Sequence, residues 1–162
     1  MKLVTWALLF SLAGCGFHLR TSDIGTSLES ARVEASKRNL LTQPLRRALS
    51  RSGVNEADTG ESQIVVKLLD QRKVRRSVSV TGRGRAAEYE TTLQVRYQVR
   101  DADGVELIAP RWVRSERVIR VDRNVVGNSE ELELLEQEMQ NDLVQQILRA
   151  LNAVTRTTVD AG

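Results

Sequence analysis

The stretch YETTLQVRYQVR, residues 89–100, alternates between two kinds of side chain along its whole length. Its odd positions hold Tyr, Thr, Leu and Val, and its even positions hold Glu, Thr, Gln and Arg. A period of two over this length predicts an antiparallel strand with one buried face and one face in water. The sequence DADG at 101–104 then predicts a hairpin turn in which Gly104 supplies a positive φ.

Three further strands are expected on either side of this segment. A short first strand is predicted at 32–35, and a run that begins at Ile64 predicts a strand that continues to Val80. After the turn, residues 105–121 form another β-rich run, in which Pro110 restricts the first part to a sheet edge or a bulge. The sequence therefore predicts four strands.

Two helices are predicted, one after the first strand and one near the end of the chain. The segment 43–53 carries Pro44 in its first turn and Gly53 where helices commonly end in the left-handed conformation. The second helix has apolar residues at spacings of three or four: Leu132, Leu135, Met139, Leu143, Ile147, Leu151 and Val154. The order β-α-β-β-β-α predicts an α+β fold, a mixed four-stranded sheet with two helices packed on one face.

The composition of the 162-residue chain is that of one globular domain, with 41% hydrophobic and 28% charged residues and a formal charge of +3. A single Cys excludes an internal disulfide framework and a Cys-rich zinc site. A single His excludes a multi-histidine metal centre and disfavours a Ser-His-Asp triad. The composition therefore argues against most enzyme classes, and no catalytic residue, metal or cofactor is expected.

The first residues have the pattern of a secretory signal. Lys2 precedes an apolar run that ends in LAGC, residues 12–15, and this run is shorter than the ~20 apolar residues that span a membrane. LAGC resembles the lipobox of bacterial lipoproteins, in which Cys15 becomes the first mature residue and carries an N-acyl S-diacylglycerol group. The alternative is an ordinary signal peptide with an unpaired Cys nearby.

The lipobox resemblance implies a division of the chain and a location. Residues 1–14 are the signal peptide, 15–30 a lipidated tether, 31–154 a single domain and 155–162 a flexible tail. Gly16 stands where many lipoproteins of the inner membrane have Asp, which implies the periplasmic face of the outer membrane. A chain anchored there through lipid does not meet nucleic acid, which is excluded as a partner.

Charge is strongly segregated along the mature chain. Residues 67–85 contain seven cations and one acid, whereas residues 129–142 contain six acids and no base. The cations would keep exposed strand edges soluble, or they would form an anion site, because the guanidinium fork binds phosphate. At the outer membrane, the abundant phosphate-bearing amphiphile is lipopolysaccharide. The candidate ligands are Arg83 and Arg85, followed by Arg75 and Arg76.

Four short motifs, in order, resemble the LptE family of LPS-assembly lipoproteins: CGFHLR at 15–20, PLRRAL at 44–49, AEY at 87–89 and the segment 138–151. This resemblance implies a role without catalysis. It implies a lipid-anchored plug inside the β-barrel LptD that helps to assemble the barrel. It also implies that the chain binds lipopolysaccharide on its way to the outer leaflet.

Two other functions are open at this point. One is a generic envelope lipoprotein that binds peptidoglycan or another envelope protein. The other is a hydrolase of lipids or the cell wall, which would need an activated nucleophile or a carboxylate pair in a cleft. Glu88 and Glu90 have the spacing of such a pair, but cross-strand pairing with arginines is the favoured interpretation.

Overall fold

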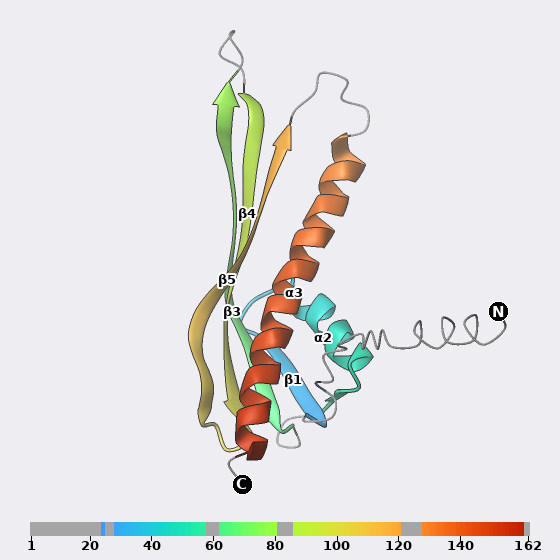
Figure 1. The fold of residues 1–162 in the computed structure, drawn as a ribbon, viewed down its shortest axis with the longest axis vertical. Coiled ribbons are helices and arrows are strands. Elements are labelled where there is room, and N and C mark those ends of the chain that lie inside the picture. Colours follow the sequence, from blue (N-terminus) through green and yellow to red (C-terminus); the bar gives the residue numbers. More distant parts are fainter. Residues whose placement is uncertain (1–23, 25–27, 58–61, 81–85, 121–127, 161–162) are drawn as a thin grey trace, which may run out of the picture.

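The computed structural model describes Ile24 and residues 28–57, 62–80, 86–120 and 128–160. Its elements are β1 (Ser30–Ala35), α2 (Thr42–Arg51), β2 (Asn55–Glu56), β3 (Ile64–Val80), β4 (Ala86–Asp101), β5 (Glu106–Arg120) and α3 (Asn128–Asp160). One sheet has the order β2-β1-β3-β4-β5, and Figure 1 shows both helices on the same side of it. The predicted α+β fold with two helices is therefore confirmed.

The predicted number of strands is wrong, because the sheet has five strands and not four. The additional strand is the two-residue β2, which pairs in parallel with β1 through Ser30↔Asn55 and Ala31↔Glu56. Two residues cannot show a period, and both are exposed. The Arg46 side chain of α2 contacts both strands, since Nε lies 2.9 Å from Glu56 Oε1 of β2 and Nη2 donates to Val33 O of β1 at 3.0 Å.

The alternation in β4 is confirmed on its apolar face, where Leu93, Val95 and Val99 are buried. On the other face Arg96 and Arg100 are exposed as predicted, but Thr92 and Gln98 are buried by their neighbours. The turn that follows also forms as predicted. Gly104 has a φ of +86°, and its N–H donates to Asp101 O at 3.2 Å. The two faces of this strand therefore follow directly from the period of two.

Pro110 lies in β5, which is the edge strand of the sheet. The register of β4 and β5 shifts between the pairs Tyr97↔Arg111 and Val99↔Ile108, so that two residues of β5 stand opposite one of β4. A bulge at a sheet edge accommodates a residue that lacks an N–H. The prediction of an edge or a bulge is confirmed, since both are present.

Both helices bury the faces that their spacing predicts. In α2, Leu45, Ala48 and Leu49 are buried, and Gly53 follows the helix with a φ of +82°. The buried residues of α3 begin at Met139, and they include Leu143, Val144, Ile147, Leu148 and Leu151. These residues pack on the sheet and form most of the core together with the apolar residues of β1, β3 and β4.

Helix α3 extends further than the sequence predicts. Residues 155–160 were expected to belong to a frayed tail, yet the helix continues to Asp160. Thr155 is buried, and its hydroxyl donates to Leu151 O at 3.1 Å. The helix can continue because no Gly or Pro interrupts the sequence between 129 and 160.

Candidate functional site

The three long strands extend well beyond the core. We define the distal sheet as residues 70–80 of β3, 86–96 of β4 and 112–120 of β5, which pair with one another throughout. Figure 1 shows the first half of α3 running alongside one face of these strands. Residues 71–78 of β3 are all exposed, so that most of the predicted basic segment is a surface and not part of the core.

The strand register divides the distal sheet into two faces. Lys73 pairs with Leu93 of β4, and Arg75 pairs with Thr91. These residues lie on the covered face, which is the face toward α3. Successive side chains of a strand point to opposite faces of the sheet, so the alternate residues of each strand point away from α3. They form the open face, which no described element covers: Arg72, Val74 and Arg76 of β3, Glu90, Thr92, Gln94 and Arg96 of β4, and Trp112, Arg114, Glu116 and Val118 of β5.

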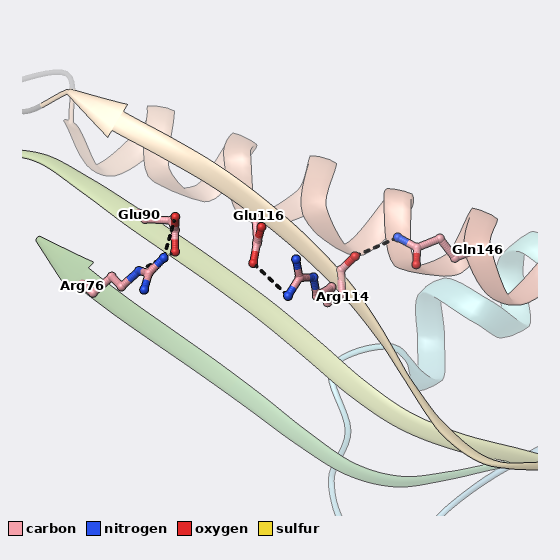
Figure 2. Close-up of polar contacts among 5 residues, drawn as sticks. All are labelled: Arg76, Glu90, Arg114, Glu116 and Gln146. Atoms are coloured by element: carbon pink, nitrogen blue, oxygen red, sulfur yellow. Dashed lines mark hydrogen bonds and ion pairs between the residues drawn. The ribbon is translucent and has the colours of Figure 1, made fainter. Parts of the chain in front are cut away.

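The open face carries paired charges, as Figure 2 shows. Arg76 binds Glu90 through two hydrogen bonds, Nε to Oε1 at 2.7 Å and Nη2 to Oε2 at 3.2 Å. This hydrogen bonding lowers the pKa of the Glu90 carboxyl. In β5, Arg114 Nη1 lies 3.5 Å from Glu116 Oε1. The preferred interpretation of Glu90, pairing with an arginine across the strands, is therefore confirmed.

Apolar side chains lie exposed between these charges. Trp112 is 37% exposed, and the guanidinium carbon of Arg72 lies 4.6 Å from the centre of its ring. Val74 and Val118 are more than half exposed. A surface that combines arginine, tryptophan and exposed aliphatic residues has the composition of a protein interface.

A crevice lies on the covered face, between the distal sheet and the first half of α3. It has a volume of about 380 Å³. Its apolar lining is formed by Leu93, Ile119, Leu132, Leu135 and Met139, and its charged lining by Lys73, Arg75, Glu133 and Glu136. The sequence does not predict this crevice, because the period of α3 indicates one continuous buried face. The sequence feature that could have indicated the crevice is the pair of cations, Lys73 and Arg75, on the strand that lies opposite the apolar face of α3.

Two contacts fix the cations of the crevice. Lys73 Nζ lies 2.5 Å from Glu136 Oε2 and thereby joins β3 to α3. The guanidinium carbon of Arg75 lies 4.1 Å from the centre of the Tyr89 ring. Among the described residues, Arg75 has no carboxylate within ion-pair distance. Its charge is therefore held in place by an aromatic ring and not neutralised by an acid.

The structure separates the candidate ligands that the sequence groups together. Arg75 lies on the covered face and Arg76 on the open face, so that the two guanidinium groups lie on opposite sides of the sheet. Arg83, Arg85 and Cys15 lie outside the described residues. The binding roles of these residues remain predictions.

No helix in the described part of the chain has the length and apolar character needed to cross a membrane.

Comparisons with known proteins agree with this architecture. A family model for LptE, described as lipopolysaccharide assembly, matches residues 28–151. The LPS-assembly lipoprotein LptE of Photorhabdus laumondii is 34% identical over 140 residues, which are 85% of this chain and 71% of that protein. The LptE of Pectobacterium atrosepticum is 30% identical over 145 residues, 86% of this chain and 77% of that protein.

A solved structure shows the same fold. The NMR structure of an uncharacterized lipoprotein B from Nitrosomonas europaea superposes with a TM-score of 0.74 at 26% identity, and it covers 90% of this chain and 96% of that one. The motifs at 44–49, 87–89 and 138–151 all lie inside the residues that the family model matches. The chain therefore belongs to the LptE family of lipopolysaccharide-assembly lipoproteins.

Proposed function

We propose that this chain is a lipid-anchored protein of the outer membrane that plugs and helps to assemble the LptD β-barrel. We also propose that it binds lipopolysaccharide while that lipid is inserted into the outer leaflet. The LptE family acts in lipopolysaccharide assembly and not in catalysis, so the prediction that the chain is not an enzyme is confirmed.

The open face of the distal sheet is the observation that supports the plug. On this face Arg72 lies over the Trp112 ring, and two other arginines are paired with carboxylates, as Arg76–Glu90 and Arg114–Glu116. Such pairs can enter a water-lined lumen without leaving an isolated charge behind. Trp112 and Val118 stand among them and provide apolar contact area. This face therefore suits the polar inner wall of a barrel.

The lipid anchor and the lipopolysaccharide site are proposed from the sequence. Acylation at Cys15 would hold the domain at the periplasmic face of the outer membrane, since two or more acyl chains anchor a protein stably. Arg83 and Arg85 would bind the phosphates of lipid A from the segment that joins β3 to β4. Replacing Cys15 by Ala is expected to remove the acyl mass from the mature N-terminal peptide in a mass spectrum.

The plug is tested by extracting the full chain from outer membranes with a mild detergent and identifying the proteins that remain bound. We expect LptD to be recovered in a stable complex. A glutamate at Val118 should reduce the yield of that complex. A glutamate at Leu134, which is equally exposed but lies on α3, is the matched control. Recovery of peptidoglycan or other envelope proteins without LptD would instead support the generic envelope lipoprotein.

A further inference from the structure

The crevice exists because the apolar face of α3 continues past the end of the core. Met139 is 1% exposed and is the first fully buried residue of the helix among those described. Leu135 and Leu132, which lie one and two turns earlier, are only half-buried and line the crevice instead. Leu93 and Ile119 form the opposite wall on the sheet. The crevice therefore has apolar side chains on both walls, one formed by α3 and the other by the sheet.

The size and lining of the crevice favour a slender apolar occupant. Its volume of about 380 Å³ lies near the lower end of ligand-binding pockets, which span ~300–1,000 Å³. That volume suits one hydrocarbon chain and not a whole lipid with several. The burial of hydrocarbon against leucine, isoleucine and methionine side chains is favourable and needs no directional contact.

The four charged side chains that line the crevice sum to zero, but one of the two cations has no acid partner among the described residues. Lys73 and Glu136 neutralise each other. Glu133 is exposed on the helix side, and Arg75 stands on the strand side. The guanidinium carbon of Arg75 lies 4.1 Å from the centre of the Tyr89 ring, and a guanidinium group in contact with a ring can still bind a phosphate through its N–H groups.

We infer that the crevice binds one acyl chain of a phosphate-bearing lipid, while Arg75 binds a phosphate of the same molecule. This inference rests on the lipopolysaccharide-binding role proposed above, and it specifies which part of the lipid lies where.

Photo-crosslinking in living cells tests the inference on the full, native chain. A benzophenone amino acid replaces Leu132 in the crevice or, as a matched control, Leu134, which is 59% exposed and does not line the crevice. The same group at Ile119 probes the crevice from the sheet side and covers the case in which the Leu132 variant does not fold. A further probe at Ala86 reports lipid near the predicted ligands Arg83 and Arg85.

The expected result is a lipopolysaccharide adduct from Leu132 and Ile119 and none from Leu134. Fragment spectra of the digested adduct should place the new bond on an acyl carbon. A bond to a sugar carbon, or an adduct with a polypeptide, would overturn the acyl crevice. Lipid adducts at Ala86 without lipid adducts at Leu132 or Ile119 would also overturn the acyl crevice, but they would still support the proposed lipopolysaccharide binding. Absence of lipid adducts at every position would refute both.

The role of Arg75 has its own pair of variants. With the probe at Leu132, Arg75→Gln should lower the adduct yield about tenfold, as expected for the loss of a charge-assisted hydrogen bond. Arg149→Gln removes a cation from an exposed position near the end of α3, which lies neither in the crevice nor on the open face, and should leave the yield unchanged. Equal effects of the two variants would overturn the role of Arg75, because only the overall charge of the protein would then matter.

Discussion

The buried hydroxyl of Tyr97 is expected to lower the stability of the folded protein. Tyr97 is 0% exposed, and its hydroxyl has no hydrogen-bond partner among the described residues. An unpaired buried polar group costs about 1–3 kcal/mol. Tyr97→Phe removes that cost while keeping the ring, so we expect the free energy of unfolding to rise by about 1 kcal/mol, or the Tm by roughly 2–4 °C.

The pH dependence of stability provides a second test of the buried Tyr97 hydroxyl. Burial raises the pKa of the Tyr97 hydroxyl, and the Arg111 guanidinium lowers it to a smaller extent. The unfolded chain therefore releases this proton first, near pH 10, and the native protein loses stability as the pH rises beyond that value. The Phe variant lacks this loss, so the difference between the two proteins should widen above about pH 10.

Urea unfolding at pH 7 and pH 10.5 provides the assay, with Cys15→Ser in both proteins so that neither carries lipid. The slope of the unfolding free energy against urea should be the same in both, because the two proteins expose the same surface on unfolding. A Phe variant that is less stable at neutral pH would show that the hydroxyl has a partner, and the argument from burial would then fail.

Three further predictions follow from other parts of the chain. Arg83→Glu combined with Arg85→Glu should weaken lipopolysaccharide binding in a direct binding assay and leave the circular dichroism spectrum unchanged; undiminished binding would remove both residues from the site. Arg46→Ala should lower the free energy of unfolding by about 1 kcal/mol, because it removes the hydrogen bond to Val33 O. Arg47→Ala, which has no comparable contact to a strand among the described residues, should have an effect near zero in the same urea titration. Gly104→Ala should lower the free energy of unfolding by about 1 kcal/mol. The cause is the φ of +86° alone, since no atom lies within 4 Å of an added Cβ. An unchanged urea midpoint would show that the turn has relaxed.

The parts of the fold that the sequence predicts are those with a strong period. β4 alternates because one face is buried along most of its length, and α3 repeats every three or four residues because it packs on that face. The Asp101–Gly104 turn is predictable for a different reason, which is that few residues other than Gly adopt a positive φ. In each case the local sequence and the tertiary contact favour the same structure.

The parts that could not be predicted depend on contacts between distant residues. β2 forms through backbone pairing with β1, which lies on the other side of α2 in the sequence, and a two-residue strand leaves no pattern of its own. The sequence also does not show on which face of the sheet Arg75 and Arg76 lie. Residues 71–78 of β3 are exposed on both sides, so that their sequence shows no alternation. Only the pairing with β4 assigns one of them to the crevice and the other to the open face.

The order of the strands has a consequence for how an exported chain folds. β3, β4 and β5 are consecutive antiparallel neighbours, whereas β1 pairs in parallel with β3 across an intervening helix. Hairpins between consecutive strands close quickly, and parallel pairs with a crossover form late. We expect Leu28, Ala31 and Val33, which are buried in the finished protein, to stay accessible until the rest of the sheet exists.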